Sequence, residues 1–375
     1  MIYLNNAATS YPKPPSVISA VADTLRDMPD SSLRSSRPTG PDLLTAVRQQ
    51  LGQLFHIADH ERIFMASGAT DAINRIIGGL RLSQVIVTND NHNSVLRPLY
   101  NQEIPCNLTL LPTGGQVLTS EVLQDISVPV HTEGHTLLIL PHCSNVTGAI
   151  HDVATLCQKA HEKGMLVMVD ASQSAGCIPI DVDGWGIDIL VFTGHKSLLG
   201  PQGTGGYYVN SSLRLRPTLF GGTGSRSDII SYPDGAWEYE PGTPNLPGIA
   251  GLKAGIDYVL ERRVEKIFQQ GQQQTDWLIQ QMRAIPKVRL HSQGGASQGP
   301  VISLTIEGLH PSDAGYILLN SYGIVVRTGL QCSPLIHREL GTHPDGTLRV
   351  SLSCHTTKDD LQALVDALHD ISDSL

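Results

Sequence analysis

An aspartate and a lysine stand at the ends of two successive apolar runs in this sequence. Residues 166–169 are all apolar and lead into Asp170, and residues 187–192 lead through a short segment into Lys196. Apolar runs of this length are typical of strands buried in a parallel sheet. Because parallel strands end at the same edge of a sheet, we expect Asp170 and Lys196 to lie close together at that edge.

A lysine beside a carboxylate is the pair that pyridoxal phosphate chemistry requires. The lysine holds the cofactor as a Schiff base, and the carboxylate keeps the pyridine nitrogen protonated, so that the ring can act as an electron sink. Each residue alone has an ordinary explanation, because an aspartate that ends a strand is often a helix cap and a Gly-His-Lys segment is often a simple loop. Their order and spacing behind two buried strands favour the cofactor site.

The same two segments resemble those of a known family. Val169-Asp170-Ala171-Ser172-Gln173 and Phe192-Thr193-Gly194-His195-Lys196 are similar to the signatures of class V aminotransferase-fold enzymes. The resemblance is closest to the group II (SufS-like) cysteine desulfurases and covers nearly the whole chain. It implies pyridoxal 5'-phosphate as the cofactor, with Lys196 as the Schiff-base lysine. It also implies that Asp170 contacts the ring nitrogen, Gln173 the phenolic oxygen, and Thr193 and His195 the phosphate.

A strand, a turn of small residues and a helix follow one another between residues 63 and 74. Backbone N–H groups at the start of such a helix are free to hold an anion, so this segment is a candidate phosphate cradle. The family comparison places Ala69 and Thr70 at the contact positions. Family members often carry a threonine where Ala69 stands, so we expect one side-chain contact to be missing.

Two further polar residues come directly after predicted strands. His92 follows the strand at residues 84–88. A lone histidine in a polar loop more often faces solvent, but sites in α/β proteins gather at strand ends, and the matching family histidine stacks on the cofactor ring and shuttles protons. Asn145, which could also be a turn residue before Gly148, falls where the family has an asparagine near the phenolic oxygen and the substrate carboxylate.

Two loops carry residues that only the resemblance connects to the site. Residues 219–248 are rich in Gly, Ser and Pro, and an irregular loop of this length is usually functional or part of an interface. The resemblance implies that Thr243 in this loop reaches the partner's phosphate across a homodimer. It also implies Arg37 as a residue at the mouth of the site, although the loop at residues 31–41 otherwise looks like a solvated segment.

The reaction depends on a cysteine in a polar loop. Cys332 follows a predicted strand that contains Arg327. Most cysteines are small core residues, but a thiolate nucleophile needs exposure and nearby positive charge, as this loop offers. The segment at residues 327–332 is similar to the family's Arg-Thr-Gly-His-His-Cys, which implies Cys332 as the nucleophile and places Arg327 in the substrate site.

The C-terminal part departs from the family at some positions and matches it at others. Leu330 and Gln331 replace the two histidines, which leaves local acid–base assistance open. Pro334-Leu335-Ile336-His337 looks like a desulfurase-like branch of the same family. Arg349 matches the arginine that binds the substrate carboxylate, a task that suits a bidentate guanidinium. Without the family it would be an ordinary arginine on a strand.

Strands and helices alternate from residue 60 to residue 209, which predicts a largely parallel sheet with helices on both faces. The resemblance implies fold type I, with seven strands in that sheet and a smaller α+β C-terminal domain. We expect an N-terminal arm at 1–15 that lies over the active site and joins the small domain, a large cofactor-binding domain at 16–248, and a small domain at 249–375. A long helix from about 247 to 270 should connect the two domains.

The composition indicates which partners and which cellular compartment to expect. The net charge is −9, and without a basic stripe this argues against nucleic acid as a partner. No apolar run is long enough to cross a bilayer, and the first residues lack the features of a signal peptide. The six cysteines form no CxxC pair and no dense framework, which is usual for free thiols in a reducing cytoplasm.

We therefore expect a cytoplasmic homodimeric enzyme that converts L-cysteine to alanine and leaves a persulfide on Cys332 for a sulfur-acceptor protein. L-selenocysteine is a competing substrate. Two alternatives stay open. A β-lyase or aminotransferase of the same fold would use the cofactor but not Cys332, and a catalytically silent protein would keep the fold as a scaffold.

Overall fold

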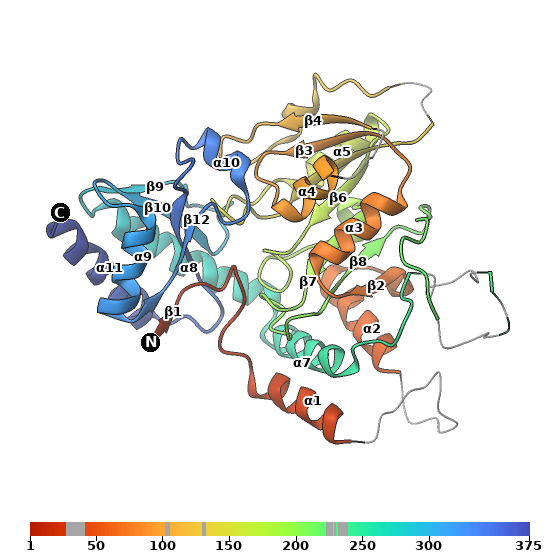
Figure 1. The fold of residues 1–375 in the computed structure, drawn as a ribbon, viewed down its shortest axis with the longest axis horizontal. Helices are drawn as coiled ribbons and strands as arrows, with labels where there is room; N and C mark the ends of the chain where they lie inside the picture. The colour runs from red at the N-terminus through yellow and green to blue at the C-terminus, as the bar shows by residue number, and fades with distance from the viewer. Residues whose placement is uncertain (28–41, 102–105, 130–132, 223–227, 229, 232–238) are drawn as a thin grey trace.

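The computed structural model has two lobes, each built on its own β-sheet (Figure 1). It describes residues 1–27, 42–101, 106–129, 133–222, 228, 230–231 and 239–375. In this part of the chain the larger sheet has seven strands in the order β2-β8-β7-β6-β5-β3-β4. The strands are β2 (Ile63–Ala66), β3 (Leu82–Thr88), β4 (Asn107–Leu111), β5 (His135–Pro141), β6 (Leu166–Asp170), β7 (Ile189–Thr193) and β8 (Gly205–Val209).

The run of strands from β7 to β4 is parallel throughout. Only β8 pairs antiparallel with its two neighbours, β7 and β2. The predicted α/β fold with a mainly parallel seven-stranded sheet is therefore confirmed. Because β3, β5, β6 and β7 point the same way, the loops after them meet at one edge of the sheet.

Alternate residues of a buried strand pack into two different cores, one on each face of the sheet. In β5, Leu138 and Leu140 join the core on one face, and Leu137 and Ile139 join the core on the other. Helices α2, α5 and α7 cover the first face, and α3 and α4 cover the second. The helices of this lobe are α1 (Pro15–Arg26), α2 (Leu43–Phe55), α3 (Ala69–Gly79), α4 (Asn93–Asn101), α5 (Val153–Glu162), α6 (Val182–Trp185) and α7 (Leu246–Arg262), with short 3₁₀ helices at His60–Arg62 and Ser120–Leu123.

The smaller lobe is a four-stranded antiparallel sheet in the order β12-β13-β10-β9, packed against helices. Its core draws on α8, α9, α11 and the strands, and also on Leu4 near the N-terminus. The N-terminal strand pairs in parallel with β11, so the chain begins in this lobe (Figure 1). The elements are β1 (Ile2–Tyr3), α8 (Val264–Arg283), β9 (Val288–Leu290), β10 (Val301–Ile306), α9 (Pro311–Tyr322), β11 (Ile324–Val325), β12 (Arg327–Gly329), α10 (Pro334–Glu339), β13 (Thr347–Ser351) and α11 (Lys358–Asp373).

The connection between the lobes is two helices where the sequence predicted one. α7 ends at Arg262 and α8 begins at Val264, because Arg263 between them has φ 65°. A residue in this left-handed region cannot continue an α-helix. The prediction of an unbroken helix is wrong, since neither Gly nor Pro marks the break in the sequence.

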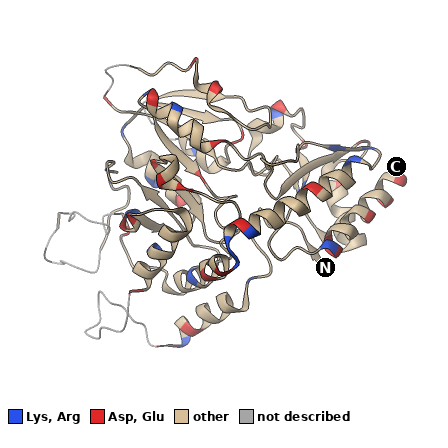
Figure 2. Ribbon diagram, turned by 180° about the vertical axis from the view of Figure 1, so that it is seen from behind, with Lys and Arg blue, Asp and Glu red and all other residues tan. Residues whose placement is uncertain are grey.

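Acidic and basic residues of the described chain are scattered over the helices in the view from behind, without a large region of one sign (Figure 2). Among the described residues, no helix is both long enough and apolar enough to span a membrane. All six cysteines are free thiols.

Candidate active site

A cavity of about 360 Å³ lies where the parallel strands of the large sheet end. Pro141, Asp170 and Thr193, the last residues of β5, β6 and β7, form part of its wall. Arg327 and Arg349 of the small lobe close it from the other side. The predicted site residues that line it are Ala69, Thr70, His92, Asn145, Asp170, Gln173, Thr193, His195, Lys196, Arg327 and Arg349.

Lys196 lies in the turn after β7, where its ε-amine is surrounded by other charged groups. Burial lowers the pKa of Lys196 to about 8; Asp170 opposes this shift, and Arg349 and Arg327 add to it. About one molecule in ten therefore carries a neutral amine at pH 7, far more than an ordinary lysine would. A neutral amine is the form that attacks a carbonyl carbon.

The turn after β6 fixes a carboxylate and an amide beside this lysine. Asp170 is buried, and its Oδ1 accepts a hydrogen bond from the N–H of Ser172 at 2.9 Å. Gln173 is also buried, and its Nε2 donates to the carbonyl of Ala7 in the N-terminal arm at 3.1 Å. Both side chains are thus held in one orientation at the cavity wall.

One end of the cavity has the features of an anion site. α3 begins at Ala69, directly after Gly68, whose φ of 150° favours glycine. Gly68, Ala69 and Thr70 line the cavity together with Thr193 and His195, so the unpaired N–H groups of the first turn of α3 are available to a ligand.

His195 and Asp71 determine the charge at this end of the cavity. Burial, helped by Lys196 and Lys13, lowers the pKa of His195 to about 4. Within the described part of the chain, the buried Nδ1 of His195 has no hydrogen-bond partner. Asp71 in the first turn of α3 is paired with Arg75 at 2.7 Å, which limits its repulsion of an anion.

His92 lies in the loop after β3 and is held as a neutral ring. Its Nδ1 accepts from the backbone N–H of Ser94 at 3.0 Å, so the proton belongs on Nε2. Burial, the nearby Lys196 and two arginines lower the pKa of His92 to about 4 against the opposing effect of Asp170. The ring is therefore uncharged at neutral pH, which suits proton transfer more than anion binding.

Arg349 is a buried cation that lacks an anionic partner among the described residues. Its side chain is 1% exposed; Nη1 donates to the carbonyl of Asn145 at 2.8 Å and Nη2 to Oδ1 of Asn5 at 3.4 Å. Its Nε is buried without a hydrogen-bond partner. Burial and the neighbouring Arg327 lower the pKa of Arg349 to about 9, so it remains charged at neutral pH. A buried charge of this kind calls for a carboxylate or a similar anion in the cavity.

Cys332 lies beside the cavity and contacts a residue that lines it. The sulfur accepts a hydrogen bond from Nη2 of Arg327 at 3.1 Å. Gln331, the preceding residue, lines the cavity, whereas Cys332 itself does not. A guanidinium donor at this distance stabilises negative charge on the sulfur, so the predicted pairing of Cys332 with a cation is present.

Besides Cys332, one other described residue of the predicted site does not line the cavity. Thr243 is exposed and does not line the cavity of its own chain. Arg37 lies outside the described residues.

The N-terminal arm holds the backbone around Lys196, and these contacts were not predicted. Ser10 Oγ donates to the carbonyl of Lys196 at 2.7 Å, and Lys13 Nζ donates to the carbonyl of His195 at 2.8 Å. Burial lowers the pKa of Lys13 to about 8. A lysine between prolines carries no recognisable motif, so only the expected position of the arm over the site pointed to this region.

The chain is similar to known proteins over nearly its whole length. The family model described as Aminotransferase class-V matches residues 2–364. A probable cysteine desulfurase of Methanothermobacter thermautotrophicus is 29% identical over 99% of this chain and 94% of its own length. The apo cysteine desulfurase from Thermococcus onnurineus NA1 has a TM-score of 0.87 at 25% identity and covers 100% of this chain and 95% of its own. The cysteine desulfurase CsdA from Escherichia coli, solved with an S-sulfonic acid, has a TM-score of 0.86 at 28% identity, with 99% and 94% covered. Because the family match spans nearly the whole sequence, this chain belongs to the class-V aminotransferase family.

Proposed function

We propose that this protein is a pyridoxal 5'-phosphate-dependent cysteine desulfurase that acts on L-cysteine. The observation that carries the proposal is the pair of guanidinium groups at one end of the cavity. Arg349 is buried without an anionic partner in the described residues, and Arg327 next to it donates to the Cys332 thiol. This arrangement suits an amino-acid carboxylate bound close to a sulfur nucleophile. The similarity to cysteine desulfurases over nearly the whole chain supports it.

The residues around the cavity fit the cofactor. Lys196 would attach it through the ε-amine, Asp170 would keep its ring nitrogen protonated, and Gln173 would bind its phenolic oxygen. A phosphate oxygen would give the buried Nδ1 of His195 the hydrogen-bond partner that the described residues do not provide. When bound, the cofactor supplies an electron sink for charge that develops on the substrate.

The other phosphate contacts would come from α3 and β7. The N–H groups of Ala69 and Thr70 stand at the start of α3, and Thr193 ends β7 beside them. These donors and the positive end of the helix dipole suit a phosphate dianion. Ala69 offers no hydroxyl, so its contribution is limited to the backbone.

The substrate would be held and activated by residues from both lobes. Arg349 binds its carboxylate, and Asn145, whose carbonyl accepts from Arg349, lies beside it. Lys196 moves the α-proton of the substrate, and neutral His92 assists this proton transfer. Arg327 orients the sulfur of Cys332, and Arg37 stays a proposed residue at the mouth of the site.

The sulfur-transfer step requires no added oxidant or reductant. The Cys332 thiolate attacks the substrate sulfur, the carbon–sulfur bond of the substrate breaks, and a proton goes to the carbon that is left. L-cysteine and the enzyme thiol give L-alanine and an enzyme persulfide. A sulfur-acceptor protein would take the persulfide sulfur, and L-selenocysteine, which has the same carboxylate and amine, would be a second substrate.

We also propose a homodimer of two-domain subunits. The exposed position of Thr243 away from its own cavity supports a homodimer in which it completes the partner's phosphate site.

The arm at 1–15 would join a small domain to a large one. The expected boundary at residue 249 falls inside α7, whose buried residues join the core of the large sheet, so we propose to draw it within α8. The free thiols suit a cytoplasmic enzyme.

The test measures alanine release from L-cysteine, with a thiol reductant, by the wild type and by Cys332→Ala, and follows pyruvate in the same samples. We expect the wild type to form alanine. The variant should lose at least about 100-fold in rate while it still binds the cofactor, because the nucleophile is gone. Pyruvate as the main product, or an unchanged rate in the variant, would contradict the proposal.

A carbon–sulfur lyase of the same fold is the second candidate. The observation that favours it is that Cys332 does not line the cavity, so its thiol is not essential to the shape of the site. A lyase would release pyruvate from L-cysteine and would be indifferent to Cys332→Ala. The same measurement therefore separates the two functions.

A further inference from the structure

The loop that carries Cys332 has a backbone conformation that residues with a side chain rarely adopt. φ is 43° at Gln331 and 63° at Cys332. Both angles lie in the left-handed region, where Cβ approaches the backbone too closely. Two such residues in succession persist only where other contacts fix them. The contacts that fix this loop are hydrogen bonds made by the Gln331 side chain and by residues that pack against the loop.

The side chain of Gln331 anchors the loop to β13. It is 2% exposed, its Nε2 donates to the carbonyl of Thr347 at 2.8 Å, and its Oε1 accepts from Nε2 of His337 at 2.9 Å. An amide does not titrate, and both polar atoms of this one are engaged. Gln331 therefore cannot supply the proton transfer of the histidine that it replaces, and it acts as a structural link.

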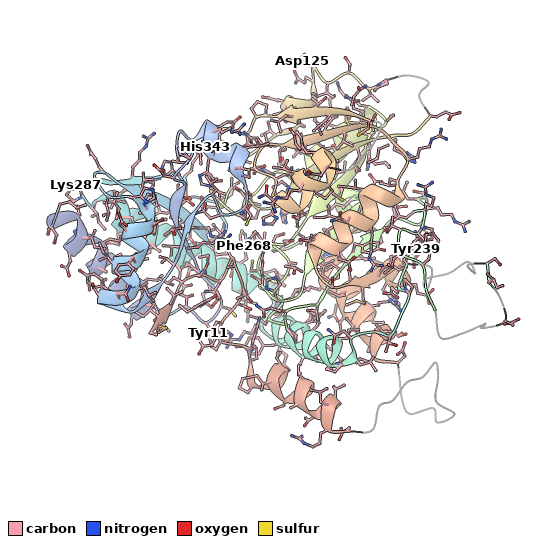
Figure 3. All side chains as sticks on the ribbon, viewed as in Figure 1. Tyr11, Asp125, Tyr239, Phe268, Lys287 and His343 are labelled. Carbon is pink, nitrogen blue, oxygen red and sulfur yellow. The ribbon has the colours of Figure 1, made fainter. Side chains whose placement is uncertain are left out.

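His337 fixes the orientation of that amide. Its ring is fully buried in α10. Because Gln331 Oε1 can only accept, the proton of the imidazole belongs on Nε2. Nδ1 then accepts from Oγ1 of Thr342 at 2.8 Å. Thr342 lies in the turn after α10, next to His343, which is labelled in Figure 3. A continuous chain of hydrogen bonds thus runs from Thr342 through His337 to Gln331.

The main chain of the loop is tied to the large lobe. Asn145 Nδ2 donates to the carbonyl of Gln331 at 2.8 Å, and Asn145 Oδ1 accepts from the hydroxyl of Ser333 at 2.8 Å. The N–H of Asn93, next to His92, donates to the carbonyl of Cys332 at 2.7 Å. The residues on both sides of Cys332 are held by these contacts, and the thiol is the part that faces Arg327.

We propose that Gln331 and His337 are positioning residues that hold Cys332 in its left-handed conformation, with the thiol fixed beside Arg327 and the cavity. The proposal rests on the desulfurase function proposed above. It explains why the loop works without the family's two histidines: their place is taken by an uncharged, buried network instead of by another acid or base. Sulfur transfer at this site then depends on alignment of the thiol.

The network predicts a specific kinetic effect. His337→Leu removes the shorter of two hydrogen bonds to Gln331 Oε1 and leaves the one from Thr347 Oγ1 at 3.3 Å. The strained backbone can then relax, so the thiol moves away from the substrate sulfur. Misplacement of a reacting group by about 1 Å can lower kcat by a factor of about 100. The KM for L-cysteine should stay within about twofold, because Arg349 still binds the substrate carboxylate.

The experiment compares the cofactor-loaded wild type with three variants. His337→Leu removes the donor, and His337→Gln keeps an N–H close to the position of Nε2. His291→Gln is the control, because His291 is a half-buried histidine of the small lobe whose ring bonds only Thr305 Oγ1 among the described residues, at 3.1 Å. Hydrogen exchange of the peptide at residues 328–336 is measured together with kcat and KM for alanine formation.

We expect His337→Leu to raise hydrogen exchange of that peptide about tenfold and to lower kcat about tenfold or more. His337→Gln should bring exchange and kcat most of the way back to the wild-type values. His291→Gln should leave both exchange and kcat unchanged. Unchanged exchange in His337→Leu would overturn the proposal, and so would a His337→Gln variant as impaired as His337→Leu. If His337→Leu fails to fold, Thr342→Val replaces it in the experiment. This variant removes the hydroxyl that donates to Nδ1 of His337. It should raise exchange and lower kcat about threefold each. If the wild type forms no alanine, the desulfurase function fails, whereas the exchange data still test how the loop is held.

Discussion

A buried guanidinium is stable only where an anion or a set of acceptors compensates its lost hydration. Arg349 and Arg327 stand opposite each other on β13 and β12, so two cations repel at one end of the cavity. The described residues offer Arg349 only a carbonyl and an amide oxygen. This uncompensated charge is the residue-scale reason to expect an amino-acid carboxylate here.

Replacement of the two arginines should separate binding from chemistry. Arg349→Lys keeps the charge but loses the bidentate fork, so the KM for L-cysteine should rise at least about tenfold with a smaller change in kcat. Arg327→Lys should lower kcat and leave KM within about threefold, because Arg327 contacts the Cys332 sulfur. Steady-state rates of alanine formation measure both. An equal rise of KM in the two variants would show that both arginines bind the carboxylate.

Attachment of the cofactor should follow the titration of Lys196. Burial lowers the pKa of Lys196 to about 8, so the neutral, reactive amine grows about tenfold for each pH unit up to that value and then levels off. We expect the rate of covalent attachment of pyridoxal 5'-phosphate to the cofactor-free protein to follow this curve, as read by absorbance. A rate that still climbs between pH 9 and pH 10 would contradict a lowered pKa.

At the residue scale, the sequence predicted the groups that end strands and missed those that bond to them. Asp170 and Lys196 could be placed together because buried apolar runs precede both. The pairing of Cys332 with Arg327 was expected, but the left-handed turn at two non-glycine residues that carries the thiol was not, because no local pattern indicates it. Gln331 departs from the motif that the sequence resembles, and only the structure shows its hydrogen-bond partners.

The start of α3 is the element where this chain differs from the expected phosphate site. Ala69 lines the cavity as the first residue of the helix. Ala69→Thr adds a hydroxyl there, and one new hydrogen bond should slow cofactor release about fivefold. Ala69→Val has the same shape without the hydroxyl and should give no gain. Release into a large volume of buffer, followed by absorbance, compares them, and equal effects of both variants would mean that packing is responsible.

Buried strands were predicted more closely than helix ends. The apolar run at 166–169 lies in β6 and most of the run at 187–192 lies in β7, because both strands are buried inside the large sheet. The break at Arg263 and the short helix α10 were missed. Both depend on tertiary contacts: α8 turns from the core of the large sheet to that of the small one, and α10 is held through buried His337.

At the scale of the whole molecule, the site is assembled by three separate parts of the chain. The large sheet supplies Lys196, the small sheet supplies Arg349, and the arm contacts both: Asn5 accepts from Arg349 and Ser10 donates to the carbonyl of Lys196. Sequence periodicity cannot place an irregular arm, because its hydrogen bonds join residues far apart in the chain. A change of the angle between the lobes would therefore alter substrate and cofactor contacts together.

A second copy of the chain is the remaining contributor that we predict. In a homodimer, Thr243→Val should speed cofactor release about fivefold through loss of one hydrogen bond to phosphate, while the dimer persists in size-exclusion chromatography. The exposed position of Thr243, outside the cavity of its own chain, is the reason to expect the partner's site to be affected.

Hybrid dimers decide which site Thr243 serves. One subunit carries Thr243→Val and the other Lys196→Ala, and two affinity tags isolate the mixed species. If Thr243 acts across the interface, the subunit with an intact Lys196 receives a normal threonine from its partner, so cofactor release from that site returns to the wild-type rate and alanine formation to about half of wild type. If Thr243 serves its own subunit, the same site keeps its valine and releases the cofactor as fast as the Thr243→Val homodimer. A monomeric wild-type protein would contradict the dimer itself.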